Sequence, residues 1–314
     1  MNTTTTDTGI DTGIDRAPSA PVPASLAQLH RAREADAFPV SWARTGDDHY
    51  AVVARWPDTH PYFVPVHGHR FDPLLVTETM RQATLLVLHA GYGVPLGHHF
   101  LLTELQFSCQ SDRLAIEDGP AEVEVQVVCS ELKWAQGHVS HLKVDMVVHR
   151  AGSAVATGSI LGRIVGPETY RRIRGDRGVP GFEVPGTPPV TAGLVGRSNP
   201  EDVLLSSTPQ DRLWQLRVDT GHPVLFQGEK DHVPGMLLLE AARQAAELAT
   251  PSQPFVPSSR RMTFQRYAEF GTPCWIEADA LATSRAGTTG ITVTGSQDGS
   301  AVFRAELSAD LPAC

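Results

Sequence analysis

The sequence predicts an α+β protein made of two repeats, each a curved antiparallel sheet wrapped around one central helix. The segment Glu78-Thr79-Met80-Arg81-Gln82-Ala83 matches Glu240-Ala241-Ala242-Arg243-Gln244-Ala245 at an offset of 162 residues. At the same offset, His60-Pro61 falls on His222-Pro223. Each matching segment lies in a helical stretch that is followed by a run of predicted strands. We therefore interpret the chain as two repeats that arose by internal duplication.

The first repeat is assigned to residues 26–165. The residues before it, 1–25, are rich in Thr, Gly, Asp and Pro, a composition typical of a disordered tail. A strand is predicted at residues 50–56, and a helix from Pro73 to about Ala90, where Gly91-Tyr92-Gly93 ends it. Alternating apolar and polar residues then predict strands near 99–107, 121–130, 138–149 and 153–165.

Residues 166–200 are rich in proline and glycine and are interpreted as a linker between the repeats. Their basic segment, from Arg171 to Arg177, is more typical of a solvated linker than of a binding patch. The second repeat, residues 201–314, has the same order of elements as the first. Its predicted elements are a strand near 212–219, a helix at 235–249 and strands near 261–267, 274–284, 289–297 and 301–309.

The helix of the second repeat carries a charged group in an apolar setting. Apart from Glu240, Arg243 and Gln244, residues 236–246 are all Met, Leu or Ala, so most of the helix surface is expected to be buried. The three polar residues share one side of the helix. A carboxylate in this position has to be paired, hydrogen-bonded or shifted in pKa. It is therefore a candidate general base, and the alternative is an intrahelical Glu–Arg pair on a solvated stripe.

Composition excludes several classes of protein. Hydrophobic residues make up 41% of the chain and charged residues 19%, with a net charge of −9, which describes a soluble globular protein and argues against binding to nucleic acid. No apolar run is long enough to span a membrane, and Met1–Thr6 lacks the features of a signal peptide. The four cysteines show no CxxC spacing, so reduced thiols in the cytoplasm are expected. Neither a metal site nor a cofactor is predicted, although His67-x-His69 and His98-His99 occur.

The residues of the second helix carry a family resemblance. The string from Asp231-His232-Val233-Pro234-Gly235-Met236 through Glu-Ala-Ala-Arg-Gln-Ala is similar to the A-factor biosynthesis hotdog family. These are tandem-hotdog enzymes that make γ-butyrolactone, butenolide or furan signals, and the resemblance covers residues 38–310. It implies a double hotdog fold. The first repeat departs from the string, with Asp72-Pro73 in place of Pro234-Gly235 and Arg70 in place of His232.

The resemblance implies an acyltransferase that moves a β-ketoacyl group from acyl carrier protein to a hydroxyl of dihydroxyacetone phosphate. The implied partners are thus the loaded carrier protein and dihydroxyacetone phosphate, and self-association to a homodimer stays open. The alternatives are a hotdog thioesterase or dehydratase acting on acyl thioesters, or a non-catalytic regulator that binds an acyl chain or butyrolactone. Phe226-Gln227-Gly228 followed by Pro-Gly resembles the hydroxyacyl-carrier-protein dehydratases, but the upstream histidine of that branch is missing.

Candidate residues follow from this chemistry. The candidate catalytic residues are Glu240, Glu78 and His232, the last with a local role in the turn as its alternative. Backbone N–H groups at the start of the second helix could stabilise a thioester oxyanion. The arginines could hold the phosphate or neutralise the adjacent glutamates, and the glutamines could brace the helix to the backbone. The candidate substrate-binding residues are Arg243, Arg81, Gln244, Gln82, Gly235, Met236 and Lys230.

Overall fold

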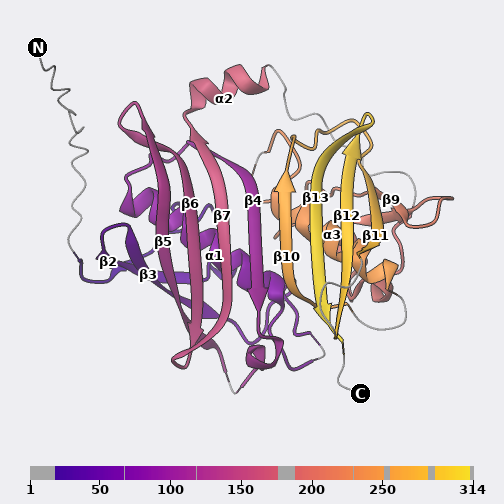
Figure 1. Cartoon of the computed structure of the whole chain (residues 1–314), viewed down its shortest axis with the longest axis horizontal. Helices are drawn as coiled ribbons and strands as arrows, with labels where there is room; N and C mark the ends of the chain where they lie inside the picture. Colours follow the sequence, from indigo (N-terminus) through magenta and orange to yellow (C-terminus); the bar gives the residue numbers. More distant parts are fainter. Residues whose placement is uncertain are drawn as a thin grey trace, which may run out of the picture.

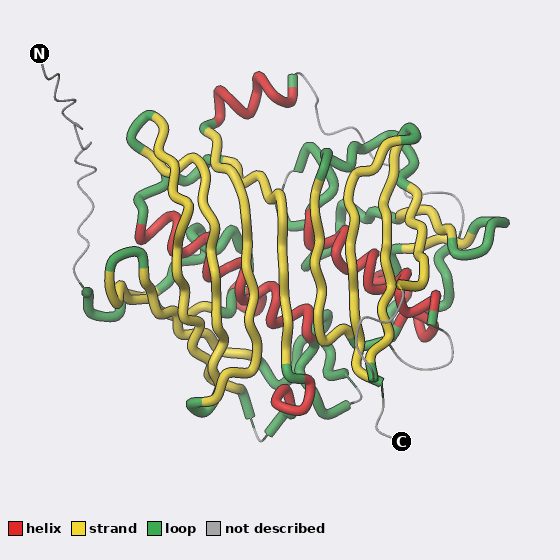
Figure 2. The backbone as a smooth tube through the Cα atoms, viewed as in Figure 1, coloured by secondary structure: helices red, strands yellow, loops and turns green. Residues whose placement is uncertain are grey.

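The computed structural model describes residues 18–66, 68–117, 119–175, 188–228, 230–250, 255–281 and 287–311. These residues form one antiparallel sheet of 13 strands with two long helices packed on one of its faces (Figures 1 and 2). The strands are β1 (Val22–Pro23), β2 (Pro39–Gly46), β3 (His49–Trp56), β4 (His99–Cys109), β5 (Ala121–Ala135), β6 (His138–Arg150), β7 (Ser153–Val165), β8 (Leu205–Ser207), β9 (Leu213–Leu216), β10 (Pro257–Phe264), β11 (Trp275–Leu281), β12 (Thr288–Gln297) and β13 (Ser300–Asp310).

The strand order shows the duplication directly. It runs β1-β2-β3-β5-β6-β7-β4-β10-β13-β12-β11-β9-β8, so the order within the second repeat mirrors that within the first. The two halves join where β4 pairs with β10, in a register from Ser108 opposite Ser259 to Glu104 opposite Thr263. We call this junction the seam. It makes one continuous sheet, with the two helices behind it related by an approximate twofold axis (Figure 1).

The central helices are α1 (Pro73–Leu86) and α3 (Gly235–Ala249). Every residue of α1 except Arg81 is buried, and in α3 the run from Leu237 to Ala246 is buried without interruption. Each helix contacts strands of its own repeat, α1 packing on β2, β3, β5 and β7, and α3 on β8, β11, β12 and β13. Each repeat is an apolar helix enclosed by a curved sheet, and two such repeats side by side form the double hotdog fold. The predicted fold class is confirmed.

Several elements differ from their predicted bounds. The first helix leaves α geometry at Leu86 and ends in a π-helical turn, Val87–Gly91. Strand β10 begins at Pro257, four residues before the predicted strand near 261–267. Strands β1, β2 and β8 lie at the two ends of the sheet and were not predicted. Their short or Pro- and Gly-bounded sequences lack a clear alternation, and pairing with a neighbouring strand fixes them instead.

The predicted linker contains a helix, α2 (Pro167–Arg174), which lies at the edge of the molecule in Figure 1. The expectation of a solvated basic segment is wrong for Arg174, whose side chain is only 4% exposed because it pairs with two carboxylates. Residues 176–187 of the linker lie outside the described residues, as do residues 1–17 of the predicted tail. The described part of that tail includes β1, which pairs with β2.

Candidate active site at the seam between the repeats

Each central helix carries one buried glutamate whose carboxylate is held by two arginines and a glutamine. One arginine and the glutamine come from the same helix, three and four residues further on. The second arginine comes from a segment outside the strands, between β1 and β2 in the first repeat and before β8 in the second. The repeat-1 cluster consists of Arg31, Glu78, Arg81 and Gln82, and the repeat-2 cluster of Arg197, Glu240, Arg243 and Gln244.

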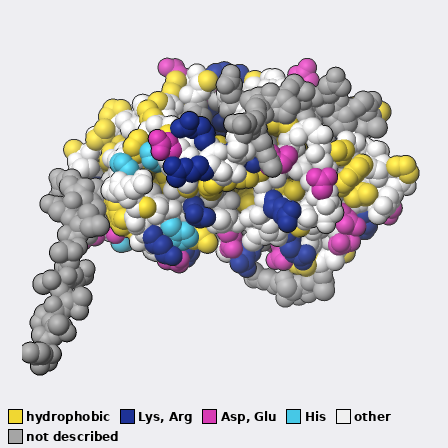
Figure 3. All heavy atoms as spheres, turned by 90° about the horizontal axis from the view of Figure 1, so that it is seen from above, with side chains coloured by type: hydrophobic (Ala, Val, Ile, Leu, Met, Phe, Trp, Pro, Cys, Tyr) yellow, Lys and Arg dark blue, Asp and Glu magenta, His cyan; other side chains and the backbone are white. Residues whose placement is uncertain are grey.

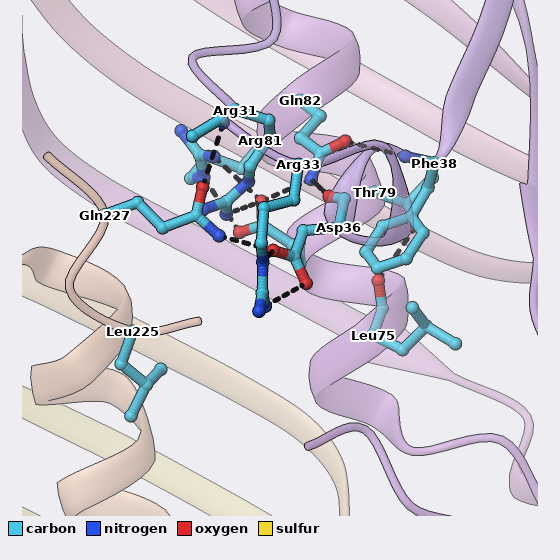
Figure 4. Close-up of polar contacts among 12 residues, drawn as sticks. Arg31, Arg33, Asp36, Phe38, Leu75, Thr79, Arg81, Gln82, Leu225 and Gln227 are labelled. Atoms are coloured by element: carbon cyan, nitrogen blue, oxygen red, sulfur yellow. Dashed lines mark hydrogen bonds and ion pairs between the residues drawn. The ribbon is translucent and has the colours of Figure 1, made fainter. Parts of the chain in front are cut away.

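In the repeat-1 cluster, shown in Figure 4, Arg81 binds Glu78 with two nitrogens, Nε to Oε2 at 2.9 Å and Nη2 to Oε1 at 2.8 Å. Arg31 donates from Nη2 to Glu78 Oε1, and Gln82 donates from Nε2 to the same oxygen at 2.7 Å. The Glu78 side chain is 2% exposed, whereas that of Arg81 is 24% exposed. The carboxylate is thus enclosed, but one of its arginines still reaches the surface.

The repeat-2 cluster repeats this arrangement in a more closed form. Arg243 binds Glu240 through Nε at 2.9 Å and Nη2 at 2.8 Å, and Arg197 donates from Nε to Glu240 Oε1 at 2.9 Å. Arg197 Nη1 also donates to the backbone carbonyl of Tyr62 at 2.8 Å, and Arg243 Nη2 donates to that of Val195 at 2.6 Å. Arg197 Nη2 lies 2.8 Å from Glu240 Oε1 as an ion pair but has no hydrogen-bond partner among the described residues. The side chains of Arg197, Glu240 and Arg243 are 3%, 0% and 9% exposed.

The pairing sets the protonation of both glutamates. Burial alone would raise the pKa of Glu78, but the charges of Arg31 and Arg81 outweigh it and lower the pKa to about 2. In the same way, Arg197 and Arg243 lower the pKa of Glu240 to about 2. The sequence favoured a carboxylate with a raised pKa that could act as a base. The structure shows the opposite shift, because the arginines stabilise the ionised form.

The glutamines join each helix to the backbone of a neighbouring segment. Gln82 donates to the carbonyl of Asp36 at 2.7 Å and accepts from the N–H of Phe38 at 2.9 Å. The Asp36 carboxylate contacts His60 Nε2 at 3.1 Å, and His60 Nδ1 accepts backbone N–H groups of its own turn. The repeat-2 counterparts make the same contacts, namely Gln244, Asp202, Leu204 and His222.

The N-termini of the two helices differ. Asp72 closes the start of α1 by accepting the N–H of Leu74 at 2.8 Å. At α3 the residue before the helix is Pro234, and no side chain caps the helix. The first N–H groups of a helix lack acceptors within the helix, so they can bind an anion or a polarised carbonyl oxygen. Gly235 also packs against Phe264 and Leu102, which places this open N-terminus at the seam.

A polar network surrounds His232, just before α3. Its Nδ1 lies 2.6 Å from Oδ1 of Asp231 and 3.3 Å from the hydroxyl of Tyr170, which itself donates to Asp231 at 2.8 Å. Arg174 of α2 ties the network together by binding Asp231 at 2.8 Å and Glu269 at 2.7 Å. The His232 side chain is 28% exposed. On the face that carries α2, Lys and Arg side chains gather beside histidines (Figure 3).

The pKa of Asp231 is lowered below its usual range, because hydrogen bonds from His232, Arg174 and Tyr170 outweigh the effect of burial. The carboxylate is therefore an acceptor, and His232 presents Nδ1–H to it. In a neutral imidazole this leaves Nε2 with the lone pair. His232 thus has the arrangement of an oriented base, and the predicted alternative of a purely local role in the turn stays open.

Lys230 of the second repeat is partly buried. Burial lowers its pKa, and the positive charges of Arg81 and Arg31 lower it further. In the first repeat, His30 Nε2 lies 2.9 Å from His89 Nε2, and His89 Nδ1 donates to the carbonyl of Val94. Burial and the nearby cations lower the pKa of His30 to about 3, so this histidine is neutral near pH 7.

The structure thus groups the predicted residues into three places. Two are the clusters around Glu78 and Glu240, and the third is the open start of α3 with Gly235, Met236 and His232. Sequence reasoning missed the partners that come from other segments, namely Arg31, Arg197, Asp36, Asp202, Tyr170 and Arg174. A signal for four of them exists, because Arg31-x4-Asp36 matches Arg197-x4-Asp202 at an offset of 166 residues, four more than the offset between the helices. Among the described residues, no group of three or more His, Cys, Asp or Glu is placed to hold a metal ion.

Within the described part of the chain, no helix has the length and apolar character needed to cross a membrane. In comparisons of structure, the fold is similar to that of the 12:0-ACP thioesterase from Umbellularia californica, with a TM-score of 0.51 and 12% identity over 82% of this chain and 97% of that one. It is also similar to a putative oleoyl thioesterase from Lactobacillus plantarum, with a TM-score of 0.53 and 11% identity over 84% and 97%. At these identities the likeness concerns the fold alone.

Proteins found by comparison of sequences share much higher identity with this chain. The chain is 53% identical to a Streptomyces coelicolor protein named 2-oxo-3-(phosphooxy)propyl 3-oxoalkanoate synthase, over 91% of both chains. Proteins of the same name from Streptomyces griseus and Streptomyces virginiae are 49% and 41% identical, over 91% and 88% of this chain and 95% and 93% of theirs. The A-factor biosynthesis hotdog domain matches residues 13–166 and 183–310. The chain, with its two repeats, belongs to the A-factor biosynthesis hotdog (AfsA) family.

Proposed function

We propose that this protein is an acyltransferase that joins a 3-oxoacyl group, delivered as a thioester on acyl carrier protein, to a hydroxyl of dihydroxyacetone phosphate. The proposal is carried by the 53% identity, over 91% of both chains, to a 2-oxo-3-(phosphooxy)propyl 3-oxoalkanoate synthase. That name describes an ester whose alcohol part is a phosphorylated three-carbon ketone. The ester is the precursor of a γ-butyrolactone, butenolide or furan signal.

The reaction needs a base and an oxyanion site. The acceptor hydroxyl gives up its proton as its oxygen attacks the thioester carbonyl carbon, and the resulting tetrahedral oxyanion collapses with cleavage of the C–S bond. The carrier thiolate leaves and takes up a proton. Both catalytic groups can come from the start of α3, because no side chain caps this helix and the N–H groups of Gly235 and Met236 are available to stabilise an oxyanion.

We assign the base to His232, whose Nε2 is left as the acceptor by the bond from Nδ1–H to Asp231. Glu240 and Glu78 are poor bases in this setting, because each stays ionised between two arginines and a base with so low a pKa takes up protons weakly. We give them the role of holding the arginines in position. Arg81, Arg243 and Lys230 are the cationic candidates for the phosphate of the acceptor.

Both repeats belong to the same chain, so the proposed reaction does not require a second copy of the protein. The three described cysteines, Cys109, Cys129 and Cys274, are all free and buried. Reduced thiols and a carrier-bound thioester substrate support a cytoplasmic location.

The test is an incubation of the purified protein with a 3-oxoacyl carrier-protein thioester, with and without dihydroxyacetone phosphate, followed by mass spectrometry. We expect the phosphorylated ester, or its ring-closed product, only when the acceptor is present. Release of free 3-oxo acid at the same rate in both incubations would instead assign the protein as a thioesterase. Loss of water from a 3-hydroxyacyl thioester would assign it as a dehydratase.

A further inference from the structure

Two segments of the second repeat lie side by side at the start of α3. The ring of Tyr267 contacts that of His232 edge-on, with 4.7 Å between the ring centroids. One residue further along both segments, the N–H of Val233 donates to the carbonyl of Ala268 at 2.9 Å. The proposed base is therefore held directly against the aromatic ring of Tyr267.

The segment that carries Tyr267 also contacts the helix itself. Phe264, the last residue of β10, has its ring 3.5 Å from the position that a Cβ on Gly235 would take. Tyr267 follows three residues later, in the loop after β10. It thus belongs to one short segment that contacts both the proposed base and the first residue of α3.

Arg174 holds the ring of Tyr267 in place. The guanidinium carbon of Arg174 lies 4.1 Å from the ring centroid, while its nitrogens bind Asp231 and Glu269. The hydroxyl of Tyr267, by contrast, makes no hydrogen bond to any of the described residues. Burial raises the pKa of Tyr267, so the hydroxyl keeps its proton near pH 7 and is available as a hydrogen-bond donor.

The counterpart of this tyrosine in repeat 1 is a glutamine. Leu105 of β4 lies opposite Met262 of β10 where the two strands pair at the seam. Five residues further along the chain, repeat 1 has Gln110 and repeat 2 has Tyr267. The start of α1 is also capped by Asp72, and an arginine takes the place of the histidine. The phenol, the imidazole and the uncapped helix start therefore occur together in repeat 2, and the fold itself does not require a tyrosine at this position.

We propose that Tyr267 is a further catalytic residue of the acyl transfer, and that its hydroxyl donates a hydrogen bond to the oxyanion formed at the thioester carbonyl. This inference rests on the proposed function for the identity of the donor substrate. When the acceptor oxygen attacks the carbonyl carbon, one electron pair of the C=O bond moves to the carbonyl oxygen. Tyr267 stabilises that charge and keeps its own proton. The electron pair returns to the carbon–oxygen bond as the C–S bond breaks and the thiolate leaves.

The test removes the hydroxyl and keeps the ring. Tyr267→Phe preserves the ring contacts with Arg174 and His232, so the urea midpoint should not change. We expect kcat for ester formation to fall about a hundredfold or more, the usual effect of losing one donor to an oxyanion, with both Michaelis constants within about twofold of the wild type. The matched control is Tyr50→Phe on β3. Tyr50 also has an arginine, Arg44, over its ring at 4.7 Å and a hydroxyl without a partner among the described residues, and its loss should leave kcat unchanged.

A second measurement does not depend on turnover. A 3-oxoacyl carrier-protein thioester labelled with carbon-13 at its thioester carbonyl is bound without the acceptor, and the carbonyl stretch is recorded by infrared spectroscopy. A hydrogen bond to the carbonyl oxygen lowers the stretching frequency. We therefore expect a higher frequency in Tyr267→Phe than in the wild type or in Tyr50→Phe. Equal frequencies, or an unchanged kcat, would overturn the role of Tyr267. A raised Michaelis constant for the acceptor at unchanged kcat would also overturn it, because the hydroxyl would then bind the acceptor and not the oxyanion.

The infrared measurement separates this inference from the proposed function. If the wild type forms no ester but the carbonyl frequency rises in Tyr267→Phe, the contact of Tyr267 stands and the proposed function falls. If the wild type forms ester while the two frequencies are equal, the proposed function stands and the role of Tyr267 is wrong. If the wild type gives no band from a bound thioester carbonyl, both are wrong.

Discussion

Replacing Glu240 with glutamine tests whether the buried glutamates are ionised structural anchors. The pKa of Glu240 falls from an ordinary 4.5 to about 2 in the folded protein. A shift of that size corresponds to about 3 kcal/mol of folding free energy, since each pKa unit is worth about 1.4 kcal/mol. Glutamine keeps the size of the side chain but resembles the protonated acid, so Glu240→Gln should lose about this amount near neutral pH. This lies at the lower end of the roughly 3–5 kcal/mol found when one partner of a buried ion pair is removed.

The sign of the pH dependence follows from the depressed pKa. The stabilisation by Glu240 is fully present above the unfolded-state pKa, and it disappears as pH falls through the folded-state value of about 2. The difference between wild type and Glu240→Gln should therefore shrink from about 3 kcal/mol near pH 7 to about 1 kcal/mol near pH 3. Urea unfolding followed by circular dichroism at both pH values measures it, with the exposed Glu277→Gln as the control. A destabilisation that is equal at the two pH values would refute the assignment of Glu240 as an ionised anchor.

Three other variants test separate parts of the site. His232→Asn should lower kcat about a hundredfold or more while leaving the urea midpoint unchanged, because it removes a general base from a partly exposed position; an unchanged kcat would return His232 to a role in the turn. The double change Arg171→Glu and Arg172→Glu on the exposed face of α2 should raise the Michaelis constant for a donor on the acidic carrier protein, but not for a small-molecule thioester. Arg260 is buried over the ring of Phe107, and none of its three guanidinium nitrogens has a partner among the described residues. Arg260→Met should therefore raise the stability of the ligand-free protein by about 1–3 kcal/mol, and a lower urea midpoint would show that this charge is compensated.

The sequence was sufficient for the fold because the duplicated helices are apolar on nearly all sides, and α3 lies at the predicted residues 235–249. It also identified Glu78 and Glu240 as buried carboxylates in need of partners. The sequence did not reveal the side chains from distant segments that bind these glutamates. Arg31 and Arg197 lie more than forty residues before the glutamates they bind, where no local periodicity links them. The direction of the pKa shift depends on these arginines, which is why burial alone suggested a base.

The role of the linker was hidden for a similar reason. Its proline and glycine content indicates irregular chain, and the eight-residue helix α2 is held by tertiary contacts rather than by intrinsic propensity. Arg174 is indistinguishable in the sequence from its solvated neighbours. Only the packing of α2 brings it to Asp231 and Glu269, and so links the linker to the residues around His232.

The pairing of β4 with β10 within a single chain has a consequence for how such a protein can evolve. In an assembly of two identical subunits, every substitution appears at both symmetry-related positions. Fusion of the halves removes that constraint. Position 230 can be lysine while its counterpart, position 68, is glycine, and the two halves can supply different groups to one site.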